Sequence, residues 1–161
     1  MNQSDRIGIG RLVLFAGLAG GAAEILWVML YGSVADVSAG QVAQQVTASV
    51  WPAAALSPAA PLAGIVIHMA LALALAALCA PLLLRIGAQH AAGGAMAMMA
   101  VLALTLVWAV NFFLVLPVIN PGFVALMPYG ATLISKMLFG LAMAAVIRRN
   151  ALRAGTVRSA A

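Results

Sequence analysis

Hydrophobic residues lie in four long runs along this chain, separated by short segments that are richer in polar residues. Each run is long enough to cross a bilayer as a helix, which takes about 20 mostly apolar residues. The pattern predicts helices over residues 12–33, 62–84, 94–116 and 128–147. These helices use most of the 161 residues, so we expect a single transmembrane domain. The predicted fold class is all-α, an integral membrane four-helix transmembrane bundle.

The longest connection, residues 34–60, carries a second kind of pattern. Ser38 followed by Gln41 fits a capping box, in which two side chains satisfy the first backbone groups of a helix. Valines then recur at every fourth position up to Val50. The pattern predicts a short amphipathic helix over residues 39–50 that lies on the membrane surface. An Ala/Pro-rich linker follows it and leads into the second spanning helix.

Prolines shape the last connection. The sequence Asn120-Pro121-Gly122 predicts a turn. Pro128 fits the first turn of the last helix, where a missing backbone N–H is tolerated. The alternative is a helix that begins near Phe123 and is kinked at Pro128. Since residues 128–147 are just long enough to span a bilayer, we favour a start at Pro128.

Basic residues mark one side of the predicted bundle. Arginines occur before the first helix, between the second and third, and after the fourth, and the other connections have none. Basic residues in short loops remain cytoplasmic, so we expect both termini in the cytoplasm and the helix over 39–50 on the outer side. The expected location is the cell inner (plasma) membrane, with the first helix retained rather than cleaved as a signal peptide. The arginines are Arg6, Arg11, Arg85, Arg148, Arg149, Arg153 and Arg158.

Composition narrows the class of protein further. With 66% hydrophobic and 7% charged residues, the chain cannot cover the surface of a soluble domain. The net charge of +5 does not indicate nucleic-acid binding, because aromatic residues are not interleaved with the arginines. A single cysteine, Cys79, excludes an internal disulfide and a CxxC redox pair. With no catalytic constellation in sight, we expect a protein that is not an enzyme.

Each predicted spanning helix carries one conspicuous polar residue. Ionisable groups inside a membrane usually face the interior of a bundle, where they pair or serve a pathway. We therefore predict a buried polar centre, with two tyrosines and a threonine on the same helix faces as candidate lining. The centre consists of Glu24, His68, Asn111 and Lys136, and the candidate lining of Tyr31, Tyr129 and Thr132.

Counting from the flanking arginines places the polar residues in two layers. At about 1.5 Å per residue, Glu24 and Lys136 both lie roughly 18–20 Å from the cytoplasmic end. Matched depth predicts an ion pair, because either charge alone would be costly there. A stripe of glycines beside Glu24 is expected to let the first and last helices pack closely; it consists of Gly17, Gly20 and Gly21, with Gly17 and Gly21 in the GxxxG spacing. The pair is either a structural device that fixes helix register or a functional proton carrier or substrate counter-ion.

The same count places His68 and Asn111 in a second layer, roughly 25 Å from the cytoplasmic end. Because they share this depth, we expect a hydrogen bond between them. A zinc or copper site would need further ligands near His68, so no metal is predicted. Haem bound through His68, with Met29 or Met137 as a second ligand, remains an alternative. No other cofactor is expected.

The segment from Gly21 to Trp27, with Glu24 at its centre, resembles the first helix of the small multidrug resistance transporters. That helix carries a mid-membrane Glu followed shortly by an aromatic residue. The resemblance implies that Glu24 binds either a proton or a cationic substrate and that the protein works as a dimer. The long outer connection and the intramembrane Lys136 depart from the pattern of that family.

Three functions are compatible with these features. Small size and short loops favour a non-enzymatic accessory or assembly subunit of a membrane complex. The polar residues favour a small proton-coupled transporter or channel that uses Glu24, His68 and Lys136. His68 alone would suit a haem- or quinone-binding membrane anchor. The expected partners are the lipid bilayer and other membrane subunits or further copies of the chain, and not nucleic acid.

Overall fold

The computed structural model describes residues 3–87 and 93–159, and helices account for nearly all of them. No strand occurs within these two ranges. The all-α fold with four helices able to span a membrane is therefore confirmed, and these helices indicate a multi-pass membrane protein. The apolar spans are Gly8–Gly32, Ala60–Arg85, Gly94–Ile119 and Tyr129–Leu152.

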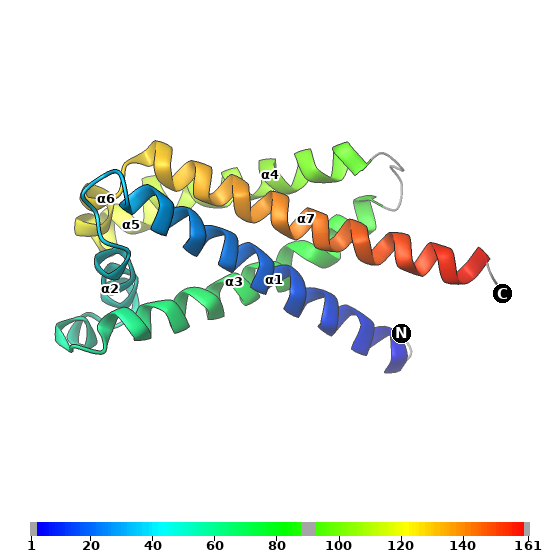
Figure 1. Cartoon of the computed structure of the whole chain (residues 1–161), viewed down its shortest axis with the longest axis horizontal. Coiled ribbons are helices and arrows are strands. Elements are labelled where there is room, and N and C mark those ends of the chain that lie inside the picture. Colours follow the sequence, from blue (N-terminus) through cyan, green and yellow to red (C-terminus); the bar gives the residue numbers. More distant parts are fainter. Residues whose placement is uncertain (1–2, 88–92, 160–161) are drawn as a thin grey trace.

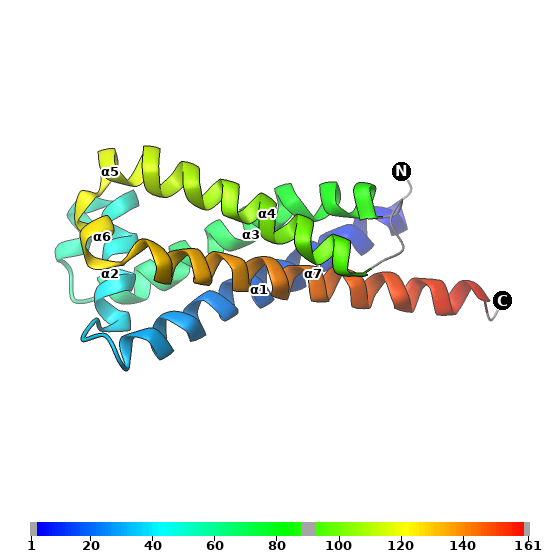
Figure 2. The ribbon, with the colours of Figure 1, turned by 90° about the horizontal axis from the view of Figure 1, so that it is seen from above.

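Four long helices form the bundle. α1 (Gln3–Gly32) crosses α3 (Ala60–Gly87) and packs against α7 (Tyr129–Ser159), as Figure 1 shows. α4 (Gly93–Val110) packs along α7 (Figure 2) but touches α3 only sparsely. The start of α1 and the end of α7 lie at the same end of the molecule (Figure 1). The bundle is therefore tightly closed around α1 and α7 and less closed between α3 and α4.

The long helices extend beyond the predicted boundaries. α1 begins at Gln3 rather than at residue 12, and α7 continues to Ser159 rather than ending at residue 147. Hydropathy marks the part of a helix that lipid can cover, whereas backbone hydrogen bonding continues into polar sequence. His90, which falls in the short segment between the second and third hydrophobic runs, lies outside the described residues.

The third span changes its helical geometry near its end. α4 is continued by a π-helix, η2 (Asn111–Val115), and by one further turn, α5 (Leu116–Ile119). The helical backbone therefore extends past the predicted end at residue 116. Asn111, one of the predicted polar residues, is the first residue of the π-helix. A short π-helical insertion of this kind often occurs at a functional site.

Short helices cover the end of the bundle opposite the termini. They are α2 (Ala39–Val50), the 3-10 helix η1 (Pro52–Leu56) and α6 (Pro121–Leu126), and they lie together in Figure 1. The capping box at the start of α2 is present, since the Gln41 amide donates to Ser38 Oγ and the Ser38 amide donates to Gln41 Oε1. The segment expected to be a plain linker thus contains a helical turn.

α2 is part of the bundle and does not lie only on a surface. Val42 is buried against Met127 and Ala131, while Val50 remains exposed. A Cβ atom added at Gly64 of α3 would collide with the backbone carbonyl of Ala43, so a glycine is required for α2 to approach this closely. The apolar side of α2 therefore contributes to the mouth of the bundle.

The segment around Asn120 is a helix start. Asn120 is the N-cap of α6, its Oδ1 accepts the amide of Phe123, and Pro121 occupies the first turn. α6 ends at Leu126, and α7 begins at Tyr129. The alternative of one kinked helix from Phe123 is therefore wrong, and Pro128 directly precedes the last helix, where its missing N–H costs little.

The core is built from small residues facing large ones. A Cβ added at Gly17 or Gly21 would meet α3, at Leu73 and at Met69, whereas one added at Gly20 would meet Phe139 of α7. The expected close packing of the first and last helices at the glycine stripe is therefore confirmed at Gly20, whereas Gly17 and Gly21 face α3, because adjacent positions on a helix point about 100° apart. The main core cluster comprises Leu12, Ala16, Ala72, Ala76, Ala80, Leu83, Ala100, Leu104, Phe139, Met143, Ala144 and Ile147.

Candidate functional site

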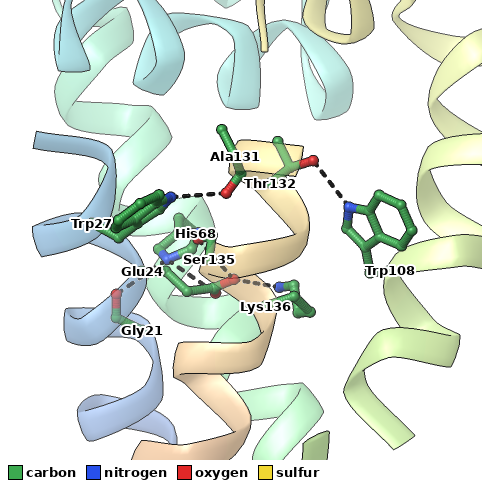
Figure 3. A network of polar contacts seen from close by, with 9 residues as sticks. All are labelled: Gly21, Glu24, Trp27, His68, Trp108, Ala131, Thr132, Ser135 and Lys136. Carbon is green, nitrogen blue, oxygen red and sulfur yellow. Dashed lines mark hydrogen bonds and ion pairs between the residues drawn. The ribbon is translucent and has the colours of Figure 1, made fainter. Parts of the chain in front are cut away.

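Glu24 lies at the centre of a buried polar cluster (Figure 3). Only 4% of the residue is exposed. Lys136 Nζ of α7 lies 2.7 Å from Glu24 Oε1, and Ser135 Oγ donates to the same oxygen at 3.5 Å. The ion pair expected from matched depth is therefore present. Buried charges of opposite sign satisfy each other's need for a partner in a low-dielectric surrounding.

His68 of α3 belongs to the same cluster. Its Nε2 lies 3.7 Å from Glu24 Oε2 and 3.4 Å from the backbone oxygen of Gly21. Among the residues that the structure describes, no hydrogen bond joins His68 to Asn111. Because His68 contacts Glu24, the predicted separation of these two residues into different layers is wrong. α1 and α3 cross at an angle (Figure 1), and counting residues along tilted helices misjudges their relative depth.

A cavity of about 700 Å³ borders this cluster. All four predicted polar residues line it, together with hydroxyl groups from α7, and most of the remaining wall is aliphatic. A volume of this size and a mostly apolar wall with a few convergent polar groups are typical of small-molecule sites. The polar lining residues include Glu24, His68, Asn111, Thr132, Ser135 and Lys136.

Of the three candidate lining residues, only Thr132 is among the described residues that line the cavity. Thr132 lines the cavity, and its hydroxyl accepts Trp108 Nε1 at 3.0 Å and donates to the backbone oxygen of Tyr129 at 3.0 Å. The ring of Tyr129 packs in an aromatic group with Trp108 and Phe113, and the ring of Tyr31 lies 6.4 Å from that of Trp27. Neither tyrosine is among the described residues that line the cavity.

Two tryptophans that the sequence analysis did not select position the start of α7. Trp27 Nε1 of α1 donates to the backbone oxygen of Ala131 at 2.8 Å. Trp108 of α4 reaches Thr132 from the opposite side of α7 (Figure 3). Buried indole N–H groups need an acceptor, so these bonds fix the first turns of α7 relative to its neighbours. The polar turn that contains Lys136 is held in place as a result.

Ser135 is a further residue that sequence reasoning missed. A signal was available, because Thr132, Ser135 and Lys136 follow the i, i+3, i+4 spacing of one helix face.

Within the described residues, no three His, Cys, Asp or Glu side chains come together as a metal site.

Comparison of the chain with protein families, with curated proteins and with solved structures gives no match. The class of protein is therefore defined by the fold and the site alone. It is a multi-pass membrane protein of four apolar helices with an ion pair and a histidine at the wall of a partly open cavity.

Proposed function

We propose that this protein is a small proton-coupled membrane transporter whose substrate site is the cavity beside Glu24, His68 and Lys136. The observation that carries the proposal is that the buried ion pair and the histidine border a cavity large enough for a small molecule. An ion pair with a purely structural role would need no space beside it. An accessory subunit would also not require ionisable groups at such a cavity.

Proton coupling follows from the charge balance of the cluster. Glu24 is stable as a carboxylate there because Lys136 contacts it at 2.7 Å. A charged substrate beside the pair changes this balance, and a proton bound together with it can restore neutrality. His68, 3.7 Å from the other carboxylate oxygen, is the nearest further group whose side chain can exchange a proton. Substrate binding and proton binding are therefore expected to depend on each other.

The orientation in the membrane is part of the proposal. The seven arginines support cytoplasmic termini, which would place α2 and α6 on the outer side of the inner membrane. Reporter fusions after Arg158 and within residues 86–93 should then report the cytoplasm, and a fusion near Gln45 should report the outside. A cytoplasmic signal near Gln45 would contradict this orientation.

Electrical measurements on reconstituted protein test transport directly. Proteoliposomes on a solid-supported membrane would be exposed to water-soluble amphiphiles with anionic, cationic or zwitterionic head groups. We expect transient currents for one class, lost in Glu24→Gln. Asp36→Asn is the matched control, because it also removes one carboxylate and because asparagine tolerates the positive φ of 51° at this exposed position. Absence of current with every class would contradict the proposal.

An accessory subunit is the second candidate, and one observation favours it. Leu71 and Leu78 of α3 line the cavity yet are 55% and 75% exposed, so a helix of another membrane protein would find an apolar surface there. Purification in mild detergent, followed by identification of bound proteins, tests this reading. A stoichiometric membrane partner together with no current for any solute would replace the transporter by the accessory subunit.

A further inference from the structure

Exposure differs sharply among the three charged or ionisable side chains of the cavity. The side chain of Glu24 is 6% exposed, whereas those of His68 and Lys136 are 24% and 21% exposed. The Glu24 side chain is therefore covered by its own partners, and the side chains of His68 and Lys136 are the more exposed members of the cluster at the cavity wall.

The hydrogen-bonding capacity of these groups also indicates that the cavity offers donors, and not a carboxylate, to a ligand. Glu24 Oε1 already faces Lys136 Nζ and Ser135 Oγ, and Oε2 faces His68. A lysine ammonium has three N–H donors and no acceptor; Lys136 Nζ contacts Glu24 and also lies over the Phe139 ring, 5.4 Å from its centroid, which leaves a further donor. The polar side of the cavity therefore offers unused donors to a ligand rather than a free carboxylate.

The rest of the cavity wall is mostly apolar and therefore favours a ligand that also carries an apolar chain. Aliphatic side chains from α1, α3 and α4 continue from the polar groups toward the side where α3 and α4 are only sparsely in contact. Exposed cavity residues on that side, such as Leu71 and Val107, would face lipid acyl chains in a membrane. A molecule can therefore place an apolar chain between α3 and α4 while its head group lies beside Lys136.

We infer that the ligand of this cavity is a single-chain amphiphile with an anionic head group, which enters from the bilayer and binds Lys136 and His68 through its head group oxygens. This inference rests on the proposed function and names its substrate class. It differs from the cationic substrate that the resemblance of the first helix implies, because Lys136 already neutralises Glu24.

The charge balance of the cavity explains why a proton would bind together with an anionic ligand. With a neutral imidazole, Glu24 and Lys136 cancel, and an added anion would bring a net negative charge into a low-dielectric site. Protonation of His68 restores neutrality. α2 and α4 contribute no charged side chain to the described cavity wall, so these three groups and the ligand set the local balance. One proton is therefore taken up with each anion.

Thermal unfolding in dodecyl maltoside micelles tests the ligand class. Dodecyl sulfonate and dodecyl trimethylammonium have the same chain and opposite permanent charges, and each would be added at low mole fraction. A ligand that binds the folded state raises the unfolding midpoint, here by an expected 4 °C or so for the sulfonate. We expect no rise with the ammonium or with inorganic sulfate, which lacks a chain.

The variants separate site binding from general attraction to a basic protein. Glu24→Gln combined with Lys136→Met leaves the net charge unchanged and should abolish the rise in unfolding midpoint caused by dodecyl sulfonate. Ala74→Phe fills the apolar part of the cavity without changing the ion pair, and should reduce this rise. Arg85→Gln removes one exposed positive charge outside the cavity wall and should leave the rise unchanged.

Each other outcome overturns the inference. An equal rise in wild type and both cavity variants would place the sulfonate elsewhere on the protein. A rise with inorganic sulfate alone would make the ligand a free anion. A rise with the ammonium only would reverse the charge of the ligand but would leave the transport proposal standing, since Glu24-dependent currents test transport for every class of solute. No rise with any of the three would remove the amphiphile as ligand.

Discussion

Two polar clusters at different places in the bundle solve the problem of buried polarity in different ways. The charged centre joins α1, α3 and α7 through Glu24, His68, Ser135 and Lys136. The cap clamp, formed by Gln45, Thr47, Ser49 and Asn120, joins α2 to α3 and to the start of α6. The first contains ionisable groups beside an open cavity, and the second consists entirely of neutral side chains.

The cap clamp has its hydrogen bonds satisfied within the protein. Asn120 Nδ2 donates to the backbone and side-chain oxygens of Gln45 at 3.0 Å and to Ser49 Oγ at 2.9 Å, while its Oδ1 accepts the Phe123 amide. Neutral groups of this kind do not change charge with pH, so the hydrogen bonds that hold α2 in the clamp do not depend on protonation. The charged centre contains ionisable groups at the cavity wall, which is why the proposed function is assigned to it.

The largest expected effect concerns the ion pair. Glu24→Gln or Lys136→Met alone leaves one buried charge without a partner, which costs about 3–5 kcal/mol in buried pairs, and less where the remaining group becomes neutral. Thermal or denaturant unfolding in detergent would show the loss. The double variant should recover most of it, since no lone charge remains. Simple addition of the two single effects would mean that the residues do not act as a pair.

The two asparagines allow a direct comparison between the clamp and the cavity. Asn120→Ala removes an N-cap and leaves partners on α2 unsatisfied, so we expect a loss of about 1–3 kcal/mol in unfolding free energy and faster hydrogen exchange in α2. Asn111→Ala lies at the cavity wall and should cost less than about 1 kcal/mol. Equal losses would contradict the separation of a structural clamp from a functional cavity.

A smaller effect is expected at Thr47. This residue is fully buried, and its hydroxyl donates to the backbone oxygen of Ala60 at 2.6 Å. Thr47→Val keeps the shape but loses that bond, for about 1 kcal/mol measured by equilibrium unfolding. Thr105→Val in α4, at a half-buried position outside the clamp, serves as the control and should be nearly neutral. A larger effect in the control would place the stabilising hydroxyl elsewhere.

The smallest effect on stability is expected at His68, where the change concerns ligand binding. His68→Gln keeps a hydrogen-bonding side chain and should alter the unfolding free energy by less than about 0.5 kcal/mol. The rise in the unfolding midpoint with dodecyl sulfonate should be smaller in the variant than in wild type, because glutamine cannot carry a positive charge beside the anion. An equal rise in His68→Gln and wild type would mean that His68 does not contribute to binding of the anion.

The sequence by itself determined the membrane class and the number of spans. Runs of apolar residues have no stable place in water, so their length and number define spanning helices without knowledge of packing. Local rules also placed the capping box at Ser38 and the start of the last helix at Pro128, one residue before α7 begins, since both depend on neighbouring residues only. Selection of Glu24 and Lys136 as partners relied on the same logic, because an unpaired charge in a membrane is costly wherever it lies.

Only the tertiary structure decided how the helices meet. Residue counts put His68 in a separate layer, but the crossing of α1 and α3 brings it to Glu24. The partners of Asn120 lie on α2, more than 70 residues away in sequence, and no local sequence pattern predicts them. The cavity likewise depends on α3 and α4 staying apart while α1 and α7 close tightly. Sequence patterns report the environment that each helix requires, whereas tilt and crossing decide which side chains share it.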